Sequence, residues 1–172
     1  LLLDRGLIED DIVLSSLDHS IYDISSNTKV IINLDNSNHK KCEFNLGENS
    51  YLLINKVYNE KELEEEVTIN LNGINSRVDY NFSTSVFDNQ RYIINVNHDN
   101  KNTVSNIINH GVVKNDSSLV FEVNSYVKKG NTGSILNQES KIILMSKNNS
   151  TIKPNLFIDE FNVDARHAAT IG

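Results

Sequence analysis

The chain has 172 residues, a mass of 19.4 kDa and a formal net charge of −7, which is enough length for one domain with a hydrophobic core. The acidic balance argues against binding to a nucleic-acid backbone, which needs a basic face. No run of 18 apolar residues is present, so we expect no membrane span, and the single cysteine excludes a disulfide framework or a zinc site built from several cysteines. A reducing, cytoplasmic location is the simplest expectation.

The N-terminal segment, residues 1–16 (LLLDRGLIEDDIVLSS), begins with apolar residues but has no basic region before them and no cleavage-type sequence after them. It therefore does not read as a signal peptide. Because the sequence does not begin with Met, we expect a fragment of a longer protein. With one proline and seven glycines, no stretch resembles a linker, and we predict a single domain over residues 1–172.

Short runs of alternating apolar and polar residues follow one another along nearly the whole chain, which is the pattern of half-buried β-strands. The predicted strands are 29–34 (KVIINL), 51–58 (YLLINKVY), 67–71 (VTINL), 77–82 (RVDYNF), 92–96 (YIINV), 119–123 (LVFEV) and 141–145 (KIILM). Asn, Asp, Ser and Gly, which favour turns, lie between them. The close spacing of the strands predicts an all-β fold rather than βαβ units.

Two all-β architectures fit this pattern: a sandwich, or a β-helix of stacked coils. Hairpin signals are scarce, since Asn72-Gly73 is the one Asn-Gly dipeptide between two predicted strands. The many asparagines at turns favour the β-helix, in which side-chain amides can stack as ladders from coil to coil. The acidic residues 60–66 (EKELEEE) fit a solvated strand edge or loop better than a helical turn.

From His98 onward the chain carries a series of ordered motifs. They are His98 with 103–105 (TVS), 111–118 (GVVKNDSS) with 120–121 (VF), 138–146 (QESKIILMS), 154–158 (PNLFI) and 163–172 (VDARHAATIG). In this order they resemble the core of the SufB/SufD family, the scaffold proteins of iron–sulfur cluster assembly. Residues 1–97 resemble that family only in their pattern of short, alternating strands.

The resemblance implies a right-handed parallel β-helix that is usually followed by a C-terminal helical segment, which docks the SufC ATPase and is missing after Gly172. It implies a scaffold rather than an enzyme. Its cargo would be a transient iron–sulfur cluster shared with a partner subunit, with no cluster expected on this fragment alone. Family members pair through the terminal part of the β-helix, so a SufB/SufD-type paralogue or a second copy is expected at an open edge near residues 159–167.

His167 is the candidate cluster or iron contact, because a neutral imidazole can bind iron. Many relatives carry a cysteine where this chain has Ala165, and Cys42 alone cannot hold a cluster through thiolates. Alternation in a regular strand places Val163, Ala165 and His167 on one face, away from Asp164. The alternative role for His167 is a hydrogen bond to a backbone group at the end of the solenoid.

Three further residues are candidates for a chemical role. Cys42 lies on an expected strand; it is a reactive thiol if exposed beside Lys40 and Lys41, and a small core residue if buried. His98 and His110 lie in neighbouring strand units, where we expect them to stabilise a turn.

A secreted β-helix that binds or cleaves polysaccharides is the alternative function. The lone cysteine, the low aromatic content of 7% and the lack of a basic cluster weigh against it.

Overall fold

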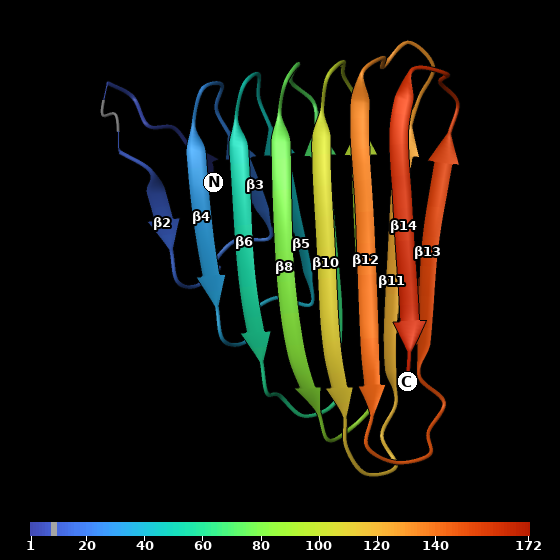
Figure 1. The fold of residues 1–172 in the computed structure, drawn as a ribbon. Helices are drawn as coiled ribbons and strands as arrows, with labels where there is room; N and C mark the ends of the chain where they lie inside the picture. Colours follow the sequence, from blue (N-terminus) through green and yellow to red (C-terminus); the bar gives the residue numbers. More distant parts are fainter. Residues whose placement is uncertain (8–9) are drawn as a thin grey trace.

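The computed structural model describes residues 1–7 and 10–172 and, over these, contains fourteen β-strands and no helix (Figure 1). The strands are β1 (Leu2–Leu3), β2 (Ile12–Leu14), β3 (Ile21–Ile24), β4 (Lys29–Leu34), β5 (Lys41–Leu46), β6 (Tyr51–Tyr58), β7 (Leu63–Leu71), β8 (Arg77–Val86), β9 (Gln90–His98), β10 (Val104–Val113), β11 (Leu119–Val127), β12 (Ser134–Leu144), β13 (Thr151–Ile158) and β14 (Val163–Ile171). In the part of the chain that is described, no helix long and apolar enough to cross a membrane occurs.

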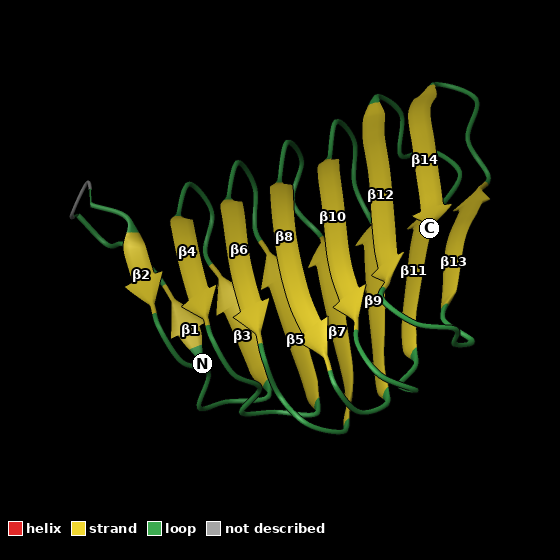
Figure 2. Ribbon diagram, turned by 60° about the horizontal axis from the view of Figure 1, so that its bottom comes forward, coloured by secondary structure: helices red, strands yellow, loops and turns green. Residues whose placement is uncertain are grey.

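Consecutive strands alternate between two sheets. The odd-numbered strands form sheet A, in the order β1 to β13, and the even-numbered strands form sheet B, in the order β2 to β14. Every pairing is parallel, so each strand lies beside the strand one full coil later (Figure 2). The expected all-β parallel β-helix is confirmed, and the sandwich is excluded because β7 and β8, which flank Asn72-Gly73, lie in different sheets.

The core lies between the two sheets, where every second side chain points inward. In β4, for example, Val30, Ile32 and Leu34 are buried. The coils lengthen along the chain: stacked asparagines are 22 residues apart between β4 and β6 but 31 apart between β10 and β12. The widening interior is filled by large side chains, and five rings pack on one another in its middle, namely Tyr58, Tyr80, Phe82, Tyr92 and Phe121.

Asparagine ladders run along the outside of the solenoid, as the sequence predicts. In sheet B the side-chain amide of Asn81 donates to Asn55 over 3.1 Å, and that of Asn55 donates to Asn33 over 3.0 Å. In sheet A, Asn155 donates to Asn124 and Asn124 to Asn95 in the same way. Each amide satisfies its neighbour, so a regular stack of short coils tolerates polar side chains on its outer faces.

One turn position repeats in five successive coils and requires a left-handed backbone. Asn27, Asn49, Asn75 and Asn102 have φ between 55° and 59° there, and Gly133 takes the same place in the next coil with φ of 76°. Asn and Gly are the residues that accept this conformation at low cost. A Cβ on Gly133 would also lie 2.2 Å from Asn102 Oδ1, so glycine is favoured at this turn for steric reasons too.

Most predicted strands coincide with observed ones. The ranges 29–34 and 51–58 match β4 and β6, and four others fall inside longer strands. The prediction for 141–145 finds only the last part of β12, which begins at Ser134 and ends at Leu144. Several inward-facing residues of β12 are polar, namely Ser134, Gln138 and Ser140. The alternation of apolar and polar residues that predicts a strand is therefore interrupted there. Residues 63–66 of the acidic run belong to β7, an internal strand of sheet A. Glu65 is buried there, so the expectation of a solvated strand edge or loop is wrong for this residue.

Candidate functional site

His167 lies in the middle of β14, the last strand of sheet B. It is in register with Gln138 of β12, whose side chain points into the interior, so His167 is on the inner face of the sheet. No later coil covers this face in the described residues, and the imidazole is therefore exposed. Asp164 lies on the outer face with Arg166, which donates to it over 3.1 and 3.2 Å. The predicted separation of His167 from Asp164 is confirmed.

The neighbour of His167 in the coil below is polar. Gln138 is 4% exposed, and its amide nitrogen donates to Ser125 Oγ over 2.8 Å and to the Asn155 carbonyl over 3.1 Å. Its Oε1 has no hydrogen-bond partner among the described residues. Leaving a buried acceptor without a hydrogen bond costs free energy, so a donor next to Gln138 Oε1 is favoured.

The acidic residues before β14 shape a loop rather than a metal site. Glu160 accepts hydrogen bonds from the backbone N–H groups of Gly130, Phe161 and Asn162, and these donors hold the pKa of its carboxyl below the usual range. Over the residues described, no group of three or more His, Cys, Asp or Glu side chains is arranged to hold a metal ion. A metal contact at His167 therefore needs ligands from outside this set.

His98 and His110 are not brought together. His98 points into the interior, where Nδ1 lies 2.7 Å from Thr103 Oγ1 and Nε2 lies 2.8 Å from Ser105 Oγ. His110 is on the outer face of sheet B, 3.7 Å from Glu139. His98 braces the turn between β9 and β10 through Thr103, which also donates to the Asn100 carbonyl.

Burial lowers the pKa of His98 to about 4, and this makes stability depend on pH. In the unfolded chain the His98 imidazole takes up a proton near pH 6.5, whereas in the folded chain it does so only near pH 4. The contribution of His98 to stability is therefore fully present above pH 6.5 and is lost as the pH falls toward 4. We expect the His98 contribution to fall by about 2 kcal/mol between pH 7 and pH 5. Urea unfolding at the two pH values, followed by circular dichroism, measures it.

The control is His98→Gln, which keeps a polar side chain at the position and removes the titration. Its urea midpoint should change much less between pH 7 and pH 5 than that of the parent chain. Equal pH dependence in both proteins would show that other groups, and not His98, govern acid sensitivity.

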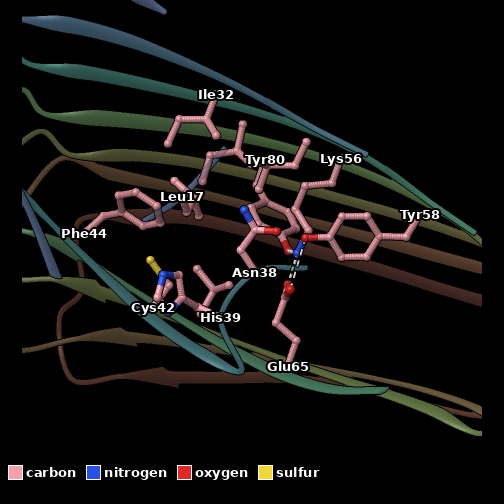
Figure 3. Close-up of a pocket in the computed structure, with 13 residues that line it drawn as sticks. Leu17, Ile32, Asn38, His39, Cys42, Phe44, Lys56, Tyr58, Glu65 and Tyr80 are labelled. Carbon is pink, nitrogen blue, oxygen red and sulfur yellow. Dashed lines mark hydrogen bonds and ion pairs between the residues drawn. The ribbon is translucent and has the colours of Figure 1, made fainter. Parts of the chain in front are cut away.

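A buried ion pair, which the alternation of apolar and polar residues did not predict, lies in the interior between β6 and β7. Lys56 of β6 donates to Glu65 of β7 and, over 2.7 Å, to Tyr80 Oη, and both charged side chains are at most 5% exposed (Figure 3). Glu65 also accepts from Tyr58 Oη over 3.1 Å and Ser37 Oγ over 2.6 Å. Burial lowers the pKa of Lys56, and the ring faces of Tyr58 and Phe82 stand 4.7 and 4.6 Å from its ammonium.

Cys42 lines the same interior region, next to a cavity of about 20 Å³ that has room for one water molecule (Figure 3). The thiol is buried, and burial together with the charge of Glu65 raises its pKa to about 12. Lys40 and Lys41 therefore do not activate it. The alternative in which Cys42 is a small core residue is confirmed, and the thiol is not a nucleophile in this fold.

The strand order and pairing define a parallel β-solenoid domain whose last strand carries an exposed histidine. A family model described as "SUF system FeS cluster assembly, SufBD core domain" matches residues 21–172. The chain therefore belongs to the SufB/SufD family through its core domain. It is 31% identical over 84 residues to the iron–sulfur cluster assembly protein SufD of Bacillus subtilis (strain 168), a match that covers 48% of this chain and 19% of that relative. No solved structure matches the chain.

Proposed function

We propose that this chain is the core of a scaffold component of the Suf machinery and works with the SufC ATPase. Membership of the SufB/SufD family supports a role in iron–sulfur cluster assembly. The observation that carries the site is the position of His167, exposed on the inner face of the last strand at the open end of the solenoid. The nascent cluster is cargo at that end.

A single imidazole ligand binds a cluster only weakly, so a partner subunit completes the site. Thiolates are the usual cluster ligands, and the only thiol of this chain is the buried Cys42. A SufB/SufD-type paralogue or a second copy bound at the open end would supply the remaining ligands. In this arrangement the protein holds the cluster and does not itself catalyse a reaction. SufC binds through a segment beyond Gly172. The protein is located in the cytoplasm.

The test replaces His167 by alanine in cells that depend on this protein for cluster assembly. We expect His167→Ala to lower the activity of iron–sulfur enzymes and the visible absorption gained on anaerobic reconstitution, with an unchanged urea midpoint because the side chain is exposed. The matched control is His110→Ala, an exposed histidine on the outer face of the same sheet, which should behave as the parent does.

Cluster assembly that is unaffected by His167→Ala would remove His167 from the site. A chain that never co-purifies with SufC in its full-length context and binds acidic polysaccharide instead would refute the scaffold role.

A further inference from the structure

The amide of Gln138 lies in register with His167, one coil earlier, and only its nitrogen has partners. The nitrogen donates to Ser125 Oγ over 2.8 Å and to the Asn155 carbonyl over 3.1 Å. Because a carbonyl only accepts, the bond to Asn155 fixes which way the amide is turned. The other end of the amide, Oε1, is buried and has no hydrogen-bond partner among the described residues. It is an acceptor that still needs a donor.

Stacked amides in this solenoid hydrogen-bond in one direction. Among the described residues, every bond between stacked asparagine side chains runs from the later coil to the earlier one. Asn137, the neighbour of Gln138 in sequence, donates in this way to Asn106 over 2.8 Å. The register makes such bonds possible, because paired strands lie about 4.8 Å apart and their side chains extend side by side. For the Gln138 oxygen, the coil that follows supplies His167.

His167 has the reach and the freedom to donate this bond. Its Nε2 and the Oε1 of Gln138 are the same number of bonds from their Cα atoms, and both side chains leave the inner face of sheet B. The neighbours of His167 on that face are Ala165 and Ala169, whose methyl groups leave the exposed imidazole room to turn. A neutral imidazole carries one N–H and one lone-pair nitrogen. A bond from Nε2–H therefore leaves Nδ1 unprotonated.

The other inward-facing histidine shows what the open end changes. Both ring nitrogens of His98 are engaged, with Nδ1 2.7 Å from Thr103 Oγ1 and Nε2 2.8 Å from Ser105 Oγ. Neither is available to a metal. His167 has an interior neighbour on one side only, since no described strand of sheet B follows β14. One of its nitrogens meets Gln138, and the other faces the open end.

We infer that Gln138 is a positioning residue for His167: its Oε1 accepts the Nε2–H of the imidazole and turns the unprotonated Nδ1 toward the open end. The inference rests on the proposed cluster site and names the group that prepares its ligand. A metal-bound histidine usually donates its other N–H to an acceptor of the protein, which fixes the tautomer and the ring orientation. In this chain the acceptor is already anchored to sheet A before any cluster arrives.

Nuclear magnetic resonance of the full-length protein, labelled with nitrogen-15 histidine and free of cluster, tests the hydrogen bond. At pH 8 an exposed imidazole is neutral, and its N–H exchanges with water too fast to give a proton signal, whereas a hydrogen-bonded N–H gives one. We expect a signal from His167 with the proton on Nε2, assigned by its loss in His167→Ala. His110 on the outer face is the internal control and should give none.

Two substitutions separate the oxygen of Gln138 from the rest of its side chain. Gln138→Glu keeps an acceptor for His167 but gives up the bonds donated to sheet A, whereas Gln138→Met removes the acceptor and the donors together. We expect the His167 N–H signal to persist in Gln138→Glu and to vanish in Gln138→Met. In Gln138→Met, cluster assembly should also fall about ten-fold or more. Urea midpoints establish that each variant is folded.

Three results would overturn the inference: no His167 N–H signal in the parent, a proton on Nδ1, or a signal that survives in Gln138→Met. Loss of the signal in both variants would do so too, because the donated bonds and not Oε1 would then hold the ring. If Gln138→Met does not fold, the parent and Gln138→Glu decide.

The outcomes for this inference and for the proposed function are distinguishable. A hydrogen-bonded His167 whose alanine variant still assembles clusters would refute the proposed function and leave the positioning by Gln138 intact. A His167 that cluster assembly requires, but that gives no N–H signal, would refute the positioning alone.

Discussion

Replacing Lys56 by methionine is expected to destabilise the fold by about 3–5 kcal/mol, a large share of the stability of a domain this size. The reason is the charge left behind. Glu65 is 4% exposed and would keep two hydroxyl donors but lose its ammonium partner. Urea unfolding at pH 7, followed by far-ultraviolet circular dichroism, measures the loss as a shift in the midpoint.

The double variant Lys56→Met/Glu65→Gln separates the charge from the packing. Glutamine still accepts from Ser37 and Tyr58 but carries no charge, so we expect it to recover most of the lost stability, to within about 1–2 kcal/mol of the parent. Lys141→Met on the outer face of β12 is the matched control and should stay within about 0.5 kcal/mol. If the double variant is as unstable as Lys56→Met, the loss comes from packing around the side chain and not from the unpaired carboxylate.

The sequence contains a signal for this pair that hydrophobicity alone conceals. In β6, Lys56 follows Leu52 and Ile54 at intervals of two, and in β7, Glu65 precedes Val67 and Ile69 in the same way. Charged residues in phase with core positions are candidates for a buried pair. Most runs of acidic residues are solvated, so such a run predicts a surface segment. Glu65 is the buried exception within the run 60–66.

The strands and their inward faces could be predicted because alternation is local. The faces of β14 followed from spacing alone, and so the separation of His167 from Asp164 was predicted correctly. The neighbour of His167 was not predictable in this way, since Gln138 meets it one coil away and the coil length changes from 22 to 31 residues along the chain. Register between coils is a property of the whole stack, and a single sequence does not reveal it.

The Asn72-Gly73 dipeptide shows the same limit at a turn. By its composition it favours a two-residue hairpin, whereas in the structure it leads from sheet A to sheet B and lies on the preceding coil. The N–H of Gly73 donates to the Leu46 carbonyl over 2.9 Å. A Cβ at this glycine would lie 2.0 Å from the backbone nitrogen of Glu48 and 2.2 Å from the carbonyl carbon of Gly47. The glycine is required by the close approach of two coils.

Gly73→Ala is therefore expected to cost about 3 kcal/mol or more, because the clash is with backbone and no side chain can turn aside to relieve it. Soluble yield and the urea midpoint measure the effect. Gly130→Ala is the matched control: that glycine has φ of 94° but no atom within 4 Å of a new Cβ, so it should cost only about 1 kcal/mol from backbone strain. Equal losses in the two variants would mean that the neighbouring coil moves to make room for the new Cβ, and that the contact between coils does not fix the glycine at position 73. A larger loss in Gly73→Ala would show that the distance between neighbouring coils at this corner is set by the main chain itself.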